Sequence, residues 1–127
     1  MKKIIIIFSV FSFMSFAPHS SSFKTTESEN FQEPKEILIH GVAIKQTITG
    51  NSNEIIHISG TDNEIKIIGS CHEIKIDGVD NVVHVDQVNL INIEGTDNVV
   101  RYKKSNNKNN IAKTKVSGVD NVIEKIK

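Results

Sequence analysis

The sequence predicts an all-β protein built as a short-repeat β-solenoid, and three features of residues 50–102 predict it. Blocks of about nine residues recur, and most of them open on glycine. Within each block, β-branched apolar residues alternate with polar ones, which is typical of a strand with one buried face. Turns of the same kind recur at every second block, so one coil would hold two strands, two turns and about 18 residues.

The alternation defines which side chains would be buried. Ile65 and Ile67 flank Lys66, and Val83 and Val85 flank His84. One block buries only two such side chains, too few to stabilise a fold, so the blocks must stack into a continuous core. An antiparallel β-sandwich of hairpins is the alternative. The solenoid is preferred because hairpins do not require like turns to recur in a fixed register.

The turns carry their own signal. Gly60, Gly78 and Gly95 each open a turn that reads Gly-Thr/Val-Asp-Asn. Glycine adopts the positive φ of a tight corner, and Asp and Asn tolerate the left-handed conformation. Because stacked asparagines form amide ladders in in-register sheets, we expect such a ladder along one edge of the solenoid. Its members would be Asn63, Asn81, Asn98 and Asn121.

The chain divides into three parts. Residues 1–22 are predicted to be a signal peptide, because two lysines precede an apolar run that is shorter than the roughly 20 residues of a membrane span. Residues 23–35 are polar and aperiodic, which indicates a flexible linker. Residues 36–127 form a single β-repeat domain, in which residues 103–113 are a basic, asparagine-rich loop insertion. We therefore expect a secreted or periplasmic mature chain without a membrane anchor.

The composition argues against a nucleic-acid partner. The chain has 15 basic and 15 acidic side chains, so it lacks the global positive charge of nucleic-acid binders. Surfaces that bind single strands also need exposed aromatic residues. From Gly50 onward the only aromatic residue is Tyr102, and the alternation places it inward.

One stretch resembles a known family. It reads GSCHEIKIDGVDNVVHVDQVNLINIEGTDNVVRY and resembles the uncharacterised bacterial family named domain of unknown function 3060 (DUF3060). The residues that occupy the places of that pattern are Cys71, Asn81, Asp86, Asn98 and Tyr102. The resemblance covers residues 50–102 and implies export and a repetitive β domain. It brings no activity, cofactor or catalytic residue.

No catalytic site is expected. Cys71 is the only cysteine, and free cysteine is commonly buried as a small apolar residue. His72 follows it directly, but adjacent side chains of a strand point to opposite faces, so His72 cannot serve as its base. The five histidines do not have the spacing of a zinc site. We therefore expect a protein that is not an enzyme and holds no cofactor.

A column of aspartates raises the question of a metal. In the 18-residue register Asp62, Asp80 and Asp97 stack along one edge, where like charges repel. Either each carboxylate caps its turn by accepting backbone N–H groups, or a cation binds between them, as in calcium-binding β-rolls. The turns lack the paired glycines of those rolls, and the other edge carries no acid. Turn capping is preferred, and a calcium-binding β-roll is the alternative function.

The remaining candidate is an interaction face. Lys66, His84 and Arg101 would stack in one outward row, beside an outward stripe that contains Val82 and Val99. A basic row beside exposed valines is typical of a contact surface. The plain alternative is a solvated sheet face whose valines serve β propensity or are covered by the insertion. The expected function is thus an exported, non-enzymatic structural or interaction module, which binds a second copy of itself or another component of the cell envelope.

Overall fold

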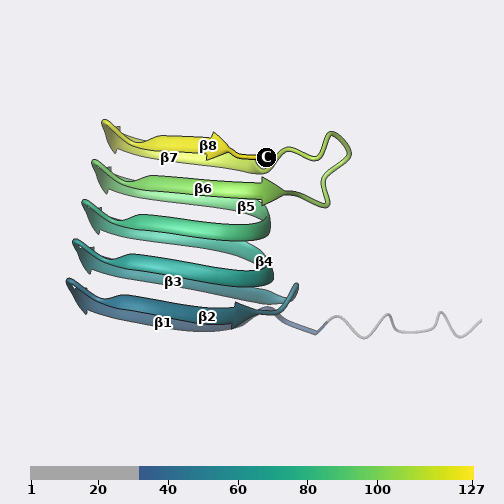
Figure 1. Cartoon of the computed structure of the whole chain (residues 1–127), viewed down its shortest axis with the longest axis horizontal. Coiled ribbons are helices and arrows are strands. Elements are labelled where there is room, and N and C mark those ends of the chain that lie inside the picture. The colour runs from purple at the N-terminus through teal and green to yellow at the C-terminus, as the bar shows by residue number, and fades with distance from the viewer. Residues whose placement is uncertain (1–31) are drawn as a thin grey trace, which may run out of the picture. The chain divides into compact units, whose positions relative to one another are not determined.

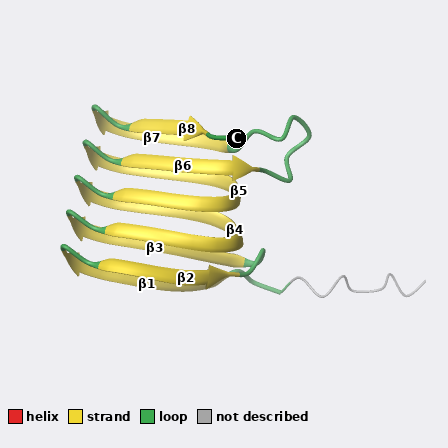
Figure 2. Ribbon diagram, in the orientation of Figure 1, coloured by secondary structure: helices red, strands yellow, loops and turns green. Residues whose placement is uncertain are grey.

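The computed structural model describes residues 32–127, so the predicted signal peptide and most of the predicted linker lie outside the described residues. Strands dominate this part of the chain, and every strand pair is parallel (Figures 1 and 2). No helix in residues 32–127 is long and apolar enough to cross a membrane. The strands are β1 (Lys35–Val42), β2 (Lys45–Gly50), β3 (Glu54–Thr61), β4 (Glu64–Val79), β5 (Val82–Thr96), β6 (Val99–Lys104), β7 (Lys113–Val119) and β8 (Val122–Lys125).

The strands stack as a two-sided solenoid. The first face consists of β1, β3, residues 73–79 of β4, residues 90–96 of β5, and β7. The second face consists of β2, residues 64–69 of β4, residues 82–86 of β5, β6 and β8. Each coil contributes one segment to each face, from the first coil (β1 and β2) to the fifth (β7 and β8). The solenoid prediction is confirmed, and the antiparallel sandwich is wrong because no strand pair of residues 32–127 is antiparallel.

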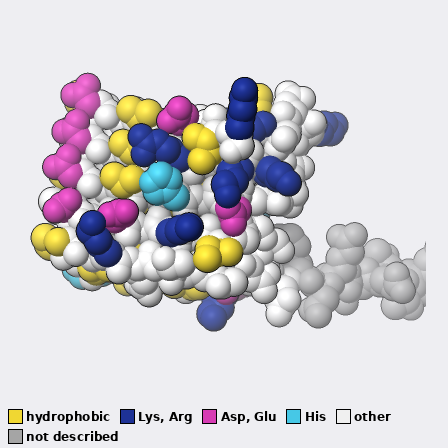
Figure 3. Space-filling model, in the orientation of Figure 1, with side chains coloured by type: hydrophobic (Ala, Val, Ile, Leu, Met, Phe, Trp, Pro, Cys, Tyr) yellow, Lys and Arg dark blue, Asp and Glu magenta, His cyan; other side chains and the backbone are white. Residues whose placement is uncertain are grey.

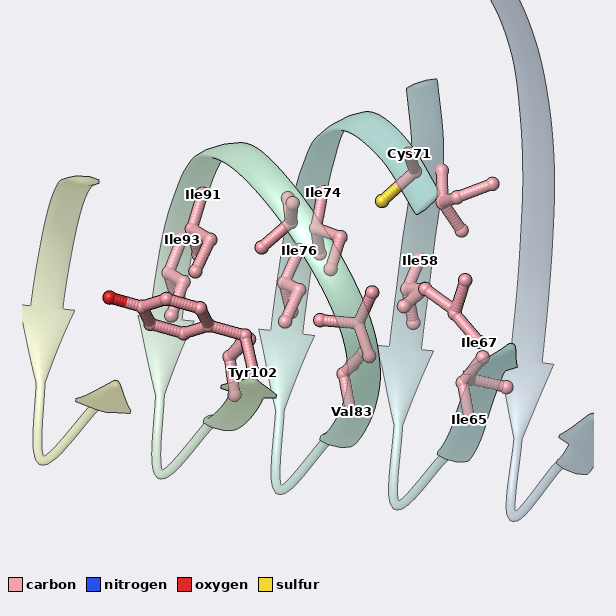
Figure 4. Close-up of a cluster of buried hydrophobic side chains, with 14 of the residues drawn as sticks. Ile58, Ile65, Ile67, Cys71, Ile74, Ile76, Val83, Ile91, Ile93 and Tyr102 are labelled. Carbon is pink, nitrogen blue, oxygen red and sulfur yellow. The ribbon is translucent and has the colours of Figure 1, made fainter. Parts of the chain in front are cut away.

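The core between the two faces consists almost entirely of isoleucine and valine. Ile58, Ile76 and Ile93 lie one above another on the first face and are fully buried. Ile65 and Val83 face them from the second face (Figure 4). These short branched side chains suit the spacing of about 10 Å between packed sheets. The alternation therefore predicted the inward and outward assignment correctly.

The turns between the first and second faces form the glycine edge of the stack. The amide ladder is present there: Asn63 Nδ2 donates to Asn81 Oδ1 at 2.9 Å, and Asn98 Nδ2 donates to Asn121 Oδ1 at 3.0 Å. Glycine is required beside the ladder, because a Cβ on Gly78 would lie 1.9 Å from the carbonyl oxygen of Gly60 in the previous coil.

The opposite side, the loop edge, differs from the expected turn. β4 and β5 run through it without a break, and the register shifts between Ile67 and Ser70, which is the mark of a β-bulge. Gly69 has a φ of 90° at this bend, a value that favours glycine. Between β6 and β7 the loop edge carries residues 105–112, which Asn89 anchors by accepting a hydrogen bond from Asn106 N at 2.9 Å.

Candidate interaction face

The register brings the predicted interaction residues together on the second face. Lys66 pairs with His84 and His84 pairs with Arg101, so the three lie in adjacent strands at the same height. Val82 pairs with Val99 in the neighbouring column, two residues closer to the glycine edge. Figure 3 shows basic and apolar side chains gathered on this face. The five residues therefore share one continuous outward surface.

The insertion does not cover the valines. The hydrogen bonds between residues 105–112 and the strands involve Gln87, Asn89, Tyr102 and Lys125, which all lie toward the loop edge. Val82 and Val99 lie beside the glycine edge instead. Both valines are half-buried, and Val122 extends their column with 48% of its surface exposed. The stripe is therefore open along three coils.

The positive charges of the row are not equally available. Arg101 Nε donates to Glu124 Oε2 at 3.2 Å in the next coil, which partly neutralises it. Lys66 is exposed and takes part in none of the ion pairs found in residues 32–127. Lys66 is therefore the cation of this row that is most readily offered to an anionic group.

A shallow depression of about 370 Å³ adjoins the row and adds residues that the sequence did not single out for it. Lys66 and His84 line it together with Asp86, Lys103 and the apolar Ile126. Lys103 Nζ donates to Asp86 Oδ1 at 2.7 Å, and Gly69 N donates to Asp86 Oδ2 at 3.0 Å. These two hydrogen bonds, that from Lys103 first, lower the pKa of Asp86 below its ordinary value. An anionic group in the depression would thus meet lysines beside a carboxylate that is already paired.

The alternation contained a signal for Lys103, because it lies two residues beyond Arg101 on the same strand. Asp86 precedes Lys103 by 17 residues, the same spacing as between His84 and Arg101, so the same register brings the pair together, although the sequence analysis did not single it out. Sequence reasoning likewise missed a contact on the first face: His57 Nδ1 lies 3.3 Å from Glu36 Oε1, and its Nε2 contacts Asp77.

The aspartates of the glycine edge stack as expected but do not cap their turns. Asp62, Asp80 and Asp97 all have φ between 55° and 58°, which places them in the left-handed region. Their backbone N–H groups bond to the next coil, as from Asp62 N to Val79 O at 3.0 Å. No hydrogen bond of the described chain ends on their carboxylates, so the expectation of capping is wrong. The side-chain oxygen of the asparagine that follows each of them accepts a backbone N–H of the previous coil instead, as Asn81 Oδ1 accepts from Asn63 N.

The same part of the chain offers no ready metal centre. Within residues 32–127, no group of three or more His, Cys, Asp or Glu side chains is placed to hold a metal ion. Asp62, Asp80 and Asp97 therefore form a column of single carboxylates, whereas calcium needs six to eight oxygen ligands.

Cys71 is buried, as expected, and His72 is exposed on the opposite side of the strand. Burial, and to a smaller extent the charge of Glu54, raises the pKa of the Cys71 thiol to about 12. The thiolate is the nucleophilic form of cysteine. Cys71 is consequently held in its protonated form at neutral pH.

Comparisons with known proteins agree with the pattern found in the sequence. The model of the family DUF3060, described as protein of unknown function, matches residues 58–114, which confirms the resemblance noted from the turns. No curated protein matches the chain, and no solved structure matches it.

Proposed function

We propose that this chain, which resembles the DUF3060 family across its central coils, is an exported, non-enzymatic interaction module. In this proposal the second face of the solenoid contacts an acidic surface of another component of the cell envelope. The supporting observation is that Lys66, His84 and Arg101 form one row beside Val82 and Val99.

The chemistry of the face fits such a partner. Lys66 and the neighbouring depression offer cationic groups to carboxylates or phosphates, while the valine stripe offers apolar area that water leaves on contact. Charge complementarity of this kind sets specificity and association rate, and the apolar contact slows dissociation. The rigid stack holds both columns in place without rearrangement.

Binding to an acidic polymer such as polyglutamate at low ionic strength tests the proposal. The double variant Val82→Thr/Val99→Thr should weaken binding at least about fivefold, because it removes apolar contact worth roughly 1 kcal/mol. Lys66→Glu should weaken it further by placing a negative charge in the row. Threonine keeps the β-branched shape, so the melting temperature should stay close to that of the original chain.

The matched control is Val79→Thr/Val119→Thr, which changes two exposed valines of the first face and should leave binding unaltered. Equal loss of binding in the control and the test variant would refute the role of the second face. Absence of any binding to acidic polymers at low salt would refute the proposed partner class.

A further inference from the structure

The charges of the solenoid are separated along its axis. Residues 32–86, which make up the first three coils, carry four lysines and nine acidic side chains, a net of −5. Residues 87–127, which make up the last two coils and the insertion, carry eight basic and four acidic side chains, a net of +4. The negative charge lies in the second and third coils, because residues 32–50 carry two lysines and two glutamates, and the positive charge lies toward the other end of the stack.

Both ends of the stack are open sheet edges. β7 pairs only with β5 and β8 pairs only with β6, so the outer edge of the fifth coil presents unpaired backbone N–H and C=O groups. Among the strands of residues 32–127, β1 and β2 leave the first coil open in the same way. Such edges are templates for pairing with another strand of suitable sequence.

The fifth coil also exposes part of its core. Val116 pairs with the buried Ile93 and points into the core layer, yet 51% of its surface is exposed because no other coil of residues 32–127 covers it. A partner that continued the stack would cover Val116 and pair the edge of β7.

We propose that a second copy of this chain is that partner, and that its first coil docks on the fifth coil, so that β1 adds to β7 as a parallel strand. Continuing the observed register places Glu36 of the second copy opposite Lys113, and Ile39 opposite Val116. Opposite charges thus meet on the outside and apolar side chains meet in the core layer.

Glycine supports the same register. The residue of the next coil that stacks on Gly118 must be glycine. In four coils of the chain, a Cβ on the glycine at this position would lie 1.8–1.9 Å from the glycine carbonyl oxygen of the previous coil. Gly41 of the second copy stands at that height. Within its own chain Gly41 has a φ of 156° but no earlier coil above it, and a Cβ there would meet only the side chain of Ile44. A free polyanion would satisfy the lysines but would use neither Val116 nor this glycine position.

The contact between β8 and β2 of the second copy is less complementary than the contact between β7 and β1, and this weakens the interface. Asn121 would face Ile44 of the second copy, which offers no amide to continue the ladder, and Lys125 would face Ile48. The interface between two copies is therefore weaker than the contact between two coils of one chain. Association is expected to be reversible and to depend on concentration and salt.

The geometry also determines the kind of assembly. Two different ends meet, so the interface is heterologous and produces linear chains of copies rather than a closed dimer. Adjacent coils lie about 4.8 Å apart, which is within the Debye length of about 8 Å at physiological salt, so Glu36 of the second copy attracts Lys113, whereas charges two or more coils away are largely screened.

Sedimentation velocity of the chain at rising concentration tests the proposal. At an ionic strength of about 20 mM the average mass should rise past that of a dimer, and at about 500 mM it should return toward the monomer. Val116→Asp should block the basic end and Glu36→Lys the acidic end, so each variant alone should stay monomeric. An equimolar mixture of the two should form a 1:1 dimer and stop there, because each retains one working end.

Two control variants show whether association is lost because an end of the stack is altered or because any such substitution would disturb it. Glu73→Lys makes the same change in the column of Glu36 but inside the stack, and Val79→Asp changes an exposed valine of the third coil; both should associate like the original chain. Because Glu36 also contacts His57, the variant Glu36→Lys/Lys113→Glu provides a second check, and its reversed charge pair should restore association.

Several results would overturn the proposal. A chain that stays monomeric at low salt at every concentration would do so, and so would binding of a polyphosphate probe to Lys113 without any self-association. Loss of association in Val116→Asp but not in Glu36→Lys would point instead to two basic ends meeting. These surfaces differ from the second face, so either proposal can fail alone.

Discussion

The side-chain amide of Asn81 donates a hydrogen bond to Oδ1 of Asn98 at 2.9 Å, and it does so inside the protein with neither residue exposed. Asn81 Nδ2 also donates to Gly60 O at 3.0 Å, while its Oδ1 accepts from Nδ2 of Asn63. Asn63, Asn81 and Asn98 each join three coils in this way. No buried side-chain nitrogen or oxygen of the described chain lacks a partner, so the ladder stabilises the edge without leaving a polar group unpaired.

Asn81→Asp is expected to destabilise the protein by more than about 3 kcal/mol. The new carboxylate would face Gly60 O and Asn98 Oδ1, which are both acceptors, and leaving one buried polar atom unpaired already costs about 1–3 kcal/mol. Urea denaturation measures the change. The reciprocal variant Asp80→Asn is the control, because Asp80 is exposed and asparagine tolerates its φ of 57°. A change above about 0.5 kcal/mol in the control would contradict this account.

Ile76→Asp is expected to cost more than about 4 kcal/mol, enough to unfold a domain whose total stability is about 5–15 kcal/mol. Only 1% of Ile76 is exposed, so the charge would enter the core. Lys75→Asp, its outward neighbour, should cost at most about 1 kcal/mol, since it loses only a half-exposed contact of 4.0 Å with Glu36 and adds a like charge there. Far-UV circular dichroism and thermal melts distinguish the two. Similar losses would mean that the inward and outward assignment is wrong.

The buried thiol predicts a loss of stability in alkali. The pKa of Cys71 is about 12 in the folded protein against an ordinary value of 9.0, so above pH 9.0 the unfolded chain loses the proton first. The free energy of unfolding should therefore fall by up to about 1.4 kcal/mol per pH unit until the pH reaches the folded pKa. Between about pH 9 and about pH 10.5 the original chain should lose up to about 2 kcal/mol relative to Cys71→Ala. If the free energy of unfolding fell equally with pH in both proteins, Cys71 would ionise freely in the folded state, and this would contradict the prediction.

Calcium at millimolar concentration is expected to leave the melting temperature and the β spectrum unchanged. The carboxylates of Asp62, Asp80 and Asp97 stand in a single column, and calcium requires six to eight oxygen ligands. A chelator should likewise not unfold the chain. A rise of many degrees on adding calcium that disappears in Asp80→Asn would instead establish the calcium-binding β-roll.

Much of the candidate interaction face followed from the alternation, because residues 18 or 17 positions apart fall in one column once coils have a constant length. This placed Lys66, His84 and Arg101 in a row. The partners of these residues did not follow. The Glu124 that contacts Arg101 comes after the insertion, and the length of the insertion hides the register from the sequence. The depression beside Lys66 depends on the path of β4 and β5 through the bulge.

The role of the aspartates was also not predictable from the sequence. Asp and Asn both bond to nearby backbone in turns, so the dipeptide alone does not reveal which of the two turns inward. In the structure the asparagine points under the edge and makes the side-chain hydrogen bonds of the corner, whereas the aspartate carboxylate makes none.

The sequence by itself determined the strands, the 18-residue coil, the amide ladder and the division of each strand into buried and exposed side chains. These features depend on local chemistry, namely period-two burial, the positive φ of turn residues and the pairing of identical amides. Only the tertiary structure decided which charges meet across coils, how the loop edge bends, and that the first and fifth coils of residues 32–127 have open edges. Those features depend on the register between segments 17 to 23 residues apart, and one shift of register would change every contact across the strands.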